Sequence, residues 1–147
     1  MDDGTGARTA ADVDGSAVGI RLVVDVANVV GSRPDGWWRD RAGAATRLLA
    51  ALPPLVGREV RGPDGAALRI AELVAVIEGA AKAAARPEGI RVVAAPADGD
   101  GSIVEVAGDG ASHRRTLVVT ADRGLRARLA DGVLVAGPGW LNELLGR

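Results

Sequence analysis

The stretch IRLVVD at residues 20–25 decides the fold class of this 147-residue chain. Its apolar residues follow one another with little polar alternation, which is typical of a strand buried on both faces of a sheet. Comparable apolar runs follow at 73–77, 90–95, 116–120 and 133–137. Helix signals fill the connections, at 37–52 before Pro53-Pro54, at 102–110, from Asp122 to Gly132 and from Pro138 onward. This alternation predicts a three-layer α/β/α domain around a central, mostly parallel sheet of about five strands.

Two segments lie outside this pattern. Residues 1–17 are small and polar, with more Asp than Arg, and we expect them to form a disordered leader before a single domain at 18–147. The segment 58–70 contains the turn signal PDG. It predicts either a short hairpin or an irregular excursion.

The composition excludes several classes of site and partner. Without Cys, and with His113 as the single His, the chain has no disulfide scaffold, no thiol chemistry and no Cys- or His-based zinc site. The lack of Phe and Tyr excludes the aromatic RNA-binding platform of an RRM. Eighteen basic against nineteen acidic residues exclude a generally basic surface, but not a local basic rim. No apolar run approaches the ~20 residues that span a bilayer, and the N-terminus is unlike a signal peptide, so we expect a cytoplasmic protein without a membrane partner.

Three acidic residues lie at or just beyond the carboxyl ends of predicted strands. Asp25 ends the first strand, Asp100 lies in the loop after 90–95, and Asp122 follows 116–120 by two positions. Each of them alone could be an ordinary helix cap or turn residue. Together they predict one site, because ligands of open α/β sheets bind at the carboxyl ends of the strands. Converging carboxylates are tolerated chiefly beside a cation, and oxygen donors favour Mg²⁺ or Mn²⁺, which suits phosphodiester cleavage.

Arginines surround these acidic positions in the sequence. They predict a rim that binds RNA phosphates without reading bases, or alternatively a solvated helix face; the candidates are Arg33, Arg39, Arg41, Arg123 and Arg126. Of the adjacent Trp37 and Trp38, we expect one to face the core and the other to be more exposed. The chief role expected for both is packing, with base stacking as the alternative for the exposed one.

Three blocks of the sequence together resemble a known family. They are LVVDVANVVGSRPDGWWRDRAGAA at 22–45, VVTADRGLRARL at 118–129 and VLVAGPGWLNELL at 133–145. They resemble the NYN domains, a PIN-like nuclease superfamily, and are most similar to its YacP-like branch. The resemblance covers about residues 20–146. It implies a PIN-like α/β/α fold and metal-dependent ribonuclease activity or a role in RNA processing.

The resemblance also implies roles for single residues. Asp25 and Asn28 match the first-strand D-x-x-N motif, and Thr120 and Asp122 match the T-x-D motif. Asp100 matches the first acidic residue of a middle motif that usually reads G-D-D. The implied catalytic residues are Asp25, Asn28, Asp100 and Asp122. The three aspartates would bind the metal, and Thr120 would orient the site or the substrate.

Two positions depart from the family pattern. Val26 stands where a small residue usually follows the first Asp, and Gly101 stands where the second carboxylate of the middle motif is usual. Fewer carboxylates imply weaker metal binding.

Three functions therefore remain open at this point. The first is a metal-dependent RNA phosphodiesterase, and the second is an RNA-binding or regulatory domain of the same fold with weakened chemistry. The third is another phosphate enzyme of similar topology. A haloacid dehalogenase would need an Asp at Ala27, and no P-loop is present. The sequence leaves the oligomeric state open, with a homodimer as one option.

Overall fold

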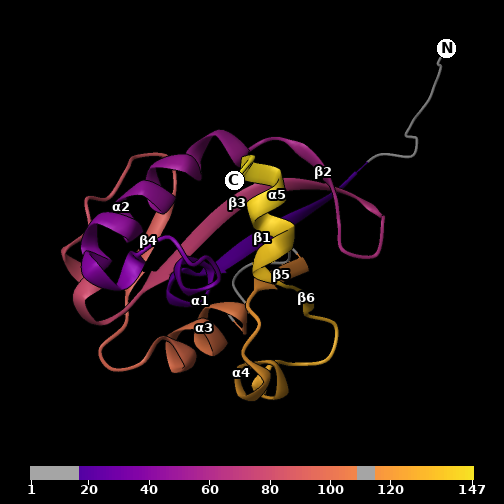
Figure 1. Cartoon of the computed structure of the whole chain (residues 1–147). Coiled ribbons are helices and arrows are strands. Elements are labelled where there is room, and N and C mark those ends of the chain that lie inside the picture. The colour runs from indigo at the N-terminus through magenta and orange to yellow at the C-terminus, as the bar shows by residue number, and fades with distance from the viewer. Residues whose placement is uncertain (1–16, 109–114) are drawn as a thin grey trace, which may run out of the picture.

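A computed structural model describes residues 17–108 and 115–147, so the predicted leader lies outside the described residues except for Ala17. The strands are β1 (Val18–Asp25), β2 (Glu59–Arg61), β3 (Ala67–Ile77), β4 (Arg91–Ala94), β5 (Arg115–Val119) and β6 (Leu134–Ala136). The α-helices are α1 (Val26–Gly31), α2 (Arg41–Ala51), α3 (Gly99–Ala107), α4 (Arg123–Arg128) and α5 (Pro138–Leu145) (Figure 1). Short 3₁₀ helices are η2 (Trp37–Arg39), η3 (Pro53–Leu55) and η4 (Gly79–Ala83).

The sheet is mostly parallel, and β1 lies at its centre. Leu22 of β1 pairs with Leu73 of β3 on one side and with Leu117 of β5 on the other. The parallel strands run in the order β4-β3-β1-β5-β6, and β2 pairs antiparallel with the start of β3. The chain thus builds outward from β1 to β4 and then returns to β5 on the other side. The strand order reverses between β1 and β5, which is where ligands bind in open sheets of this kind.

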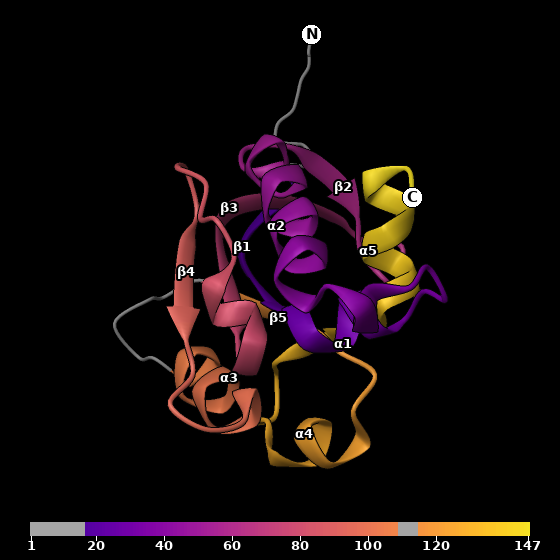
Figure 2. The same ribbon diagram turned by 60° about the vertical axis from the view of Figure 1, so that its left-hand side comes forward.

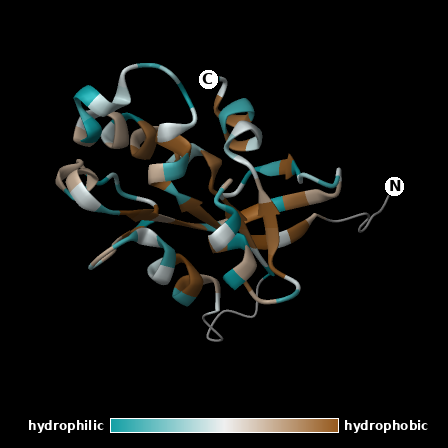
Figure 3. Cartoon of the chain, turned by 60° about the horizontal axis from the view of Figure 1, so that its bottom comes forward, coloured by the Kyte–Doolittle hydropathy of each residue, from teal (hydrophilic) through white to brown (hydrophobic). Residues whose placement is uncertain are grey.

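Helices cover both faces of the sheet, which confirms the predicted three-layer α/β/α class (Figures 1 and 2). On one face, α1, α2 and α5 enclose a core that includes Leu22, Leu48 and Leu141. On the other face, α3 and α4 pack on the sheet through Ile103 and Leu125. Figure 3 shows brown, hydrophobic residues concentrated in the strands, as expected of strands buried on both faces.

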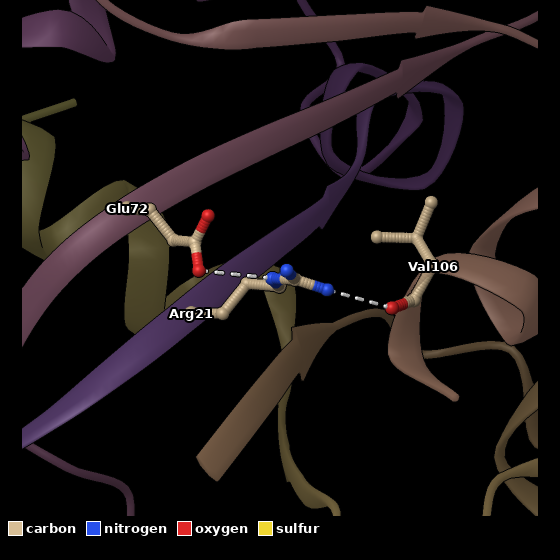
Figure 4. A network of polar contacts seen from close by, with 3 residues as sticks. All are labelled: Arg21, Glu72 and Val106. Atoms are coloured by element: carbon tan, nitrogen blue, oxygen red, sulfur yellow. Dashed lines mark hydrogen bonds and ion pairs between the residues drawn. The ribbon is translucent and has the colours of Figure 1, made fainter. Parts of the chain in front are cut away.

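The buried guanidinium of Arg21 joins β1 to both β3 and α3 (Figure 4). Arg21 lies within the apolar run of β1 and is only 6% exposed. Its Nε is 3.2 Å from Oε1 of Glu72 on β3, and its Nη1 donates a hydrogen bond of 3.0 Å to the carbonyl of Val106 in α3. Because a buried guanidinium needs partners, these contacts hold the last turn of α3 against the sheet.

The structure confirms the predicted strands and refines three boundaries. The 58–70 segment forms the hairpin alternative, as β2 and the start of β3. The helix expected over 37–52 is divided at Asp40, whose Oδ1 caps α2 by accepting from the backbone N of Gly43 at 2.9 Å. Trp37 packs against the core and Trp38 is 51% exposed, as expected. Among the described helices, none is long and apolar enough to cross a membrane.

The third boundary concerns Asp100. The sequence placed it in a loop before a helix starting at residue 102, but α3 already begins at Gly99. The reason is Asp98, whose Oδ1 accepts from the backbone N of Asp100 at 3.0 Å and caps the helix. Asp100 therefore lies in the first turn of α3.

Candidate active site

Asp25 is the last residue of β1 and the N-cap of α1. Its Oδ1 accepts from the backbone N of Asn28 at 3.3 Å, and its Oδ2 accepts from Oγ1 of Thr120 at 2.9 Å. The residue is 7% exposed. A buried carboxylate needs such donors, and they fix the direction of both oxygens.

The residues after β5 complete this arrangement from the neighbouring strand. Thr120 is fully buried, and its Oγ1 also accepts from the backbone N of Asp122 at 3.1 Å. Asp122 caps α4, with its Oδ1 accepting from the backbone N of Leu125 at 3.0 Å. Oδ1 of Asn28 accepts from the backbone N of Ala121 at 2.7 Å. Two side-chain hydrogen bonds therefore join the carboxyl ends of β1 and β5 where the strand order reverses.

Glu78 adds a carboxylate to this edge that the sequence analysis did not identify. It follows the last residue of β3, and its Oε2 accepts a hydrogen bond from the backbone N of Gly99 at the start of α3. The signal was present in the sequence, because Glu78 directly follows the predicted strand 73–77, as Asp25 ends its own strand. We name Asp25, Glu78, Asp100 and Asp122 together the acidic edge.

Burial and mutual repulsion shape the electrostatics of the acidic edge. Burial is the main cause that raises the pKa of Asp25 above its usual range; the hydrogen bonds from Thr120 and Asn28 oppose the rise, and the charges of Asp100 and Glu78 add to it. For Asp100, burial again comes first in raising the pKa, followed by the charges of Asp122 and Asp98, while Arg128 opposes. Asp100 thus interacts electrostatically with both Asp25 and Asp122. Repulsion between these carboxylates favours the binding of a cation at this edge.

The donor set of the acidic edge is entirely oxygen, which is the chemistry that Mg²⁺ and Mn²⁺ accept. Within 17–108 and 115–147, no three or more His, Cys, Asp or Glu side chains are grouped so that they could hold a metal ion. The carboxylate of Asp100 accepts no hydrogen bond in this part of the chain, and each oxygen of Asp25 retains an unused lone pair. These residues therefore fit a largely hydrated ion bound through one or two carboxylates, which is the usual mode for Mg²⁺.

A cavity of about 310 Å³ adjoins the acidic edge and shares Glu78 with it. Val26, Val30 and Trp37 supply apolar walls, and Arg41 lies at its side with Cζ 5.3 Å from the Trp37 ring centroid. The cavity is large enough to admit a planar ring system, and its polar groups are few.

The five predicted RNA-binding arginines lie on both sides of the sheet. Arg123 and Arg126 are exposed on α4. Arg39 and Arg41 lie over Trp38 and Trp37 on the opposite face, and Arg33 lines a separate cavity. The five arginines therefore do not form one cluster. His113 lies outside the described residues.

The two departures from the family pattern occupy different surroundings. Val26 is fully buried as the first residue of α1 and also lines the cavity. Gly101 is exposed in the first turn of α3, and a Cβ there would meet no heavy atom within 4 Å. A carboxylate is therefore sterically allowed at position 101.

Comparison with known proteins supports the fold. No protein-family model and no curated protein sequence matches this chain. Among solved structures, it is similar to a crystal structure of Rae1 (YacP) from Bacillus subtilis, with a TM-score of 0.64 and 15% sequence identity. The match covers 86% of this chain and 74% of that one. This chain therefore has a YacP-like fold.

Proposed function

We propose that this chain is a metal-dependent RNA phosphodiesterase of the NYN/PIN-like type, from the YacP-like branch, which acts in cytoplasmic RNA processing or turnover. The observation that carries the proposal is the acidic edge, because it lies at the reversal point of the strand order in a YacP-like fold. Burial is the main cause that raises the pKa of Asp25 and Asp100, and repulsion between the carboxylates acts in the same direction. That arrangement is unfavourable without a cation.

In this proposal Asp25, Asp100 and Asp122 share the divalent cation, Mg²⁺ or Mn²⁺: one or two of them would bind it directly and the rest through its water molecules, with Glu78 as a further carboxylate of the same edge. When bound, the ion would neutralise the scissile phosphate and lower the pKa of bound water. Because burial favours the protonated form of Asp25, metal binding should weaken as the pH falls.

Two neutral residues hold the geometry of the proposed site. Thr120 donates to the carboxylate of Asp25 and accepts from the backbone N of Asp122, so a single hydroxyl links that carboxylate to the backbone of Asp122. Oδ1 of Asn28 accepts a hydrogen bond from the backbone N of Ala121, the residue between Thr120 and Asp122. We assign both residues a positioning role, since a site held by rigid hydrogen bonds loses less entropy when substrate and metal bind.

The proposed substrate is a single RNA strand bound mainly through its phosphates. Arginines on α4 and on the η2–α2 segment flank the acidic edge and can contact the backbone on either side. The cavity bordered by Glu78 and Trp37 offers an apolar space for one unpaired base next to the scissile phosphate.

A second candidate is an RNA-binding or regulatory PIN-like domain with weakened or lost catalysis. One observation favours it: the carboxylates of the described residues form no group of three that could enclose an ion. Gly101 in place of an acidic residue points the same way.

Cleavage of labelled single- and double-stranded RNA with Mg²⁺, Mn²⁺ or EDTA tests the proposal. We expect cleavage of the single strand with either metal, none with EDTA, and at least a hundredfold loss in Asp25→Asn. The matched control is Asp131→Asn, which removes an exposed carboxylate between α4 and β6. RNA binding without cleavage under every condition would reject the nuclease and support the second candidate.

A further inference from the structure

A second cavity of about 310 Å³ lies between α2 and the end of α5, away from the carboxylates of the acidic edge. Its charged residues are Arg33, Arg47 and Arg147, with Asp35 as the one acidic residue; the remaining wall is apolar or small and includes Val30 and Leu145. Three guanidinium groups against one side-chain carboxylate give the side chains that line this cavity a net positive charge.

The backbone holds the third arginine in place. Gly146 ends α5 in the left-handed conformation, with φ of 73°, which glycine adopts without strain. The chain then turns back, and the backbone N of Arg147 donates to the carbonyl of Asn142 at 2.9 Å. Arg147 is thereby directed into the same cavity as Arg33 and Arg47.

The three guanidinium groups are not neutralised within the described residues. None of them forms an ion pair or a side-chain hydrogen bond there, and Nε of Arg147 is buried without a partner. Burial first, and then the charge of Arg33, lower the pKa of Arg147; Asp35 opposes and Arg47 adds to the effect. Like charges kept together around a buried, unpartnered donor are costly unless an anion is bound.

From this geometry we infer that Arg33, Arg47 and Arg147 form a binding site for a phosphate group. Arginine suits this ligand, because its planar fork of N–H donors matches phosphate oxygens in pairs. The phosphate has two possible sources, the backbone of an RNA strand or a free phosphate. The RNA backbone is within reach, because Val30 lines both this cavity and the one beside Glu78.

The test compares wild type with Arg33→Gln/Arg47→Gln. The matched control is Arg58→Gln/Arg91→Gln, which removes the same charge from exposed positions outside both cavities. In calorimetric titration with inorganic phosphate at constant ionic strength, we expect wild type and control to bind one phosphate with a Kd of about 1 mM or tighter. The first double variant should bind it at least about tenfold more weakly.

Thermal unfolding separates binding from a structural role. Without phosphate, the Arg33→Gln/Arg47→Gln variant should melt no lower than wild type, because the substitutions relieve repulsion. Phosphate should raise the melting temperature of wild type and control only. Absence of phosphate binding, or equal binding by both double variants, would overturn the inference.

A second arm identifies the source of the phosphate. Binding of single-stranded RNA is measured in EDTA across a salt series, so the result does not depend on whether the chain cleaves RNA. If the site holds the RNA backbone, Arg33→Gln/Arg47→Gln should flatten the slope of log K against log salt by about 0.7 for each RNA phosphate that the variant no longer neutralises, and the control should not. An unchanged slope together with weakened binding of inorganic phosphate assigns the site to a free phosphate.

Discussion

The carboxylate of Asp25 serves the fold and the proposed chemistry at once. It caps α1 and accepts a hydrogen bond from the hydroxyl of Thr120, and both hydrogen bonds favour its charged form. Its burial at the end of β1 works in the other direction and raises its pKa. The folded state therefore holds the proton of Asp25 more tightly than the unfolded chain does, and ionisation of Asp25 lowers the stability of the fold at neutral pH.

From this balance we expect Asp25→Asn to be at least as stable as wild type at neutral pH in EDTA. Asn still caps a helix well and still has a partner in Thr120. Because the pKa of Asp25 is raised in the folded state, lowering the pH from neutral through that pKa toward about pH 4 should increase the free energy of unfolding of wild type relative to that of the variant. Denaturant unfolding at both pH values measures this, with Asp131→Asn as the control. An Asp25→Asn protein clearly less stable than wild type at neutral pH would contradict it.

Thr120 is the second residue at which a single group decides the geometry. Thr120→Val keeps the shape but removes the hydroxyl between Asp25 and the backbone of Asp122. We expect a loss of about 1–3 kcal/mol in the free energy of unfolding, because the buried carboxylate of Asp25 and the partly buried backbone N of Asp122 both lose a partner. The pKa of Asp25 should rise further, since Thr120 lowers it. Thr120→Ser retains the hydroxyl and should behave nearly as wild type; equal losses in both variants would show that packing, not the hydrogen bonds, matters.

At the scale of elements, the first turn of α3 contains Asp100 and, next to it, Gly101, where the family motif usually has a second carboxylate. Gly101→Asp meets no steric obstacle, and negative charge is favoured in the first turn of a helix. We expect the free energy of unfolding to change by less than about 1 kcal/mol and the affinity for Mn²⁺ to rise severalfold. Gly101→Asn has the same size without the charge and should leave the affinity at the wild-type level. If both variants bind Mn²⁺ equally, position 101 does not face the metal.

Helices and strands that depend on their own residue pattern could be predicted from the sequence, whereas those that depend on contacts with distant residues could not. The five parallel strands are apolar runs, so their positions and their burial in a mostly parallel sheet could be predicted from stretches such as 20–25, but their order in the sheet could not. Helix α1 was not predicted, because VANVVG is rich in β-branched residues that favour strands. It is helical because Asp25 caps it and Val26 and Val29 are buried on it, and that burial is a tertiary effect.

The acidic edge was predictable to a similar extent. The places of Asp25, Asp100 and Asp122 after predicted strands indicate this edge, and Glu78 directly follows the predicted strand 73–77 in the same way. The hydrogen bonds of Asn28 and Thr120 to the other strand could not be derived locally, since their partners are 93 and 95 positions away. Only the strand order brings these residues together.

At the scale of the whole molecule, the cavity beside Glu78 offers a matched pair of substitutions in η4. Ala80 and Ala83 are both exposed, but only Ala80 lines the cavity. We expect Ala80→Leu to weaken binding of single-stranded RNA in EDTA by about tenfold, since the larger side chain fills the space for a base. Ala83→Leu should bind as wild type does, and both should melt alike. RNA binding that is unchanged in Ala80→Leu would remove this cavity from the RNA path.

The most direct test of the central claim is calorimetric titration of Mn²⁺ into the RNA-free protein, because contaminating nucleases cannot affect it. The acidic edge combines residues from β1, α3 and the segment after β5, so Asp25→Asn, Asp100→Asn and Asp122→Asn should each weaken one shared site by about tenfold or more. Asp131→Asn should bind one Mn²⁺ as wild type does. Wild-type affinity in all three variants, or no Mn²⁺ binding by wild type, would contradict a metal site at the acidic edge.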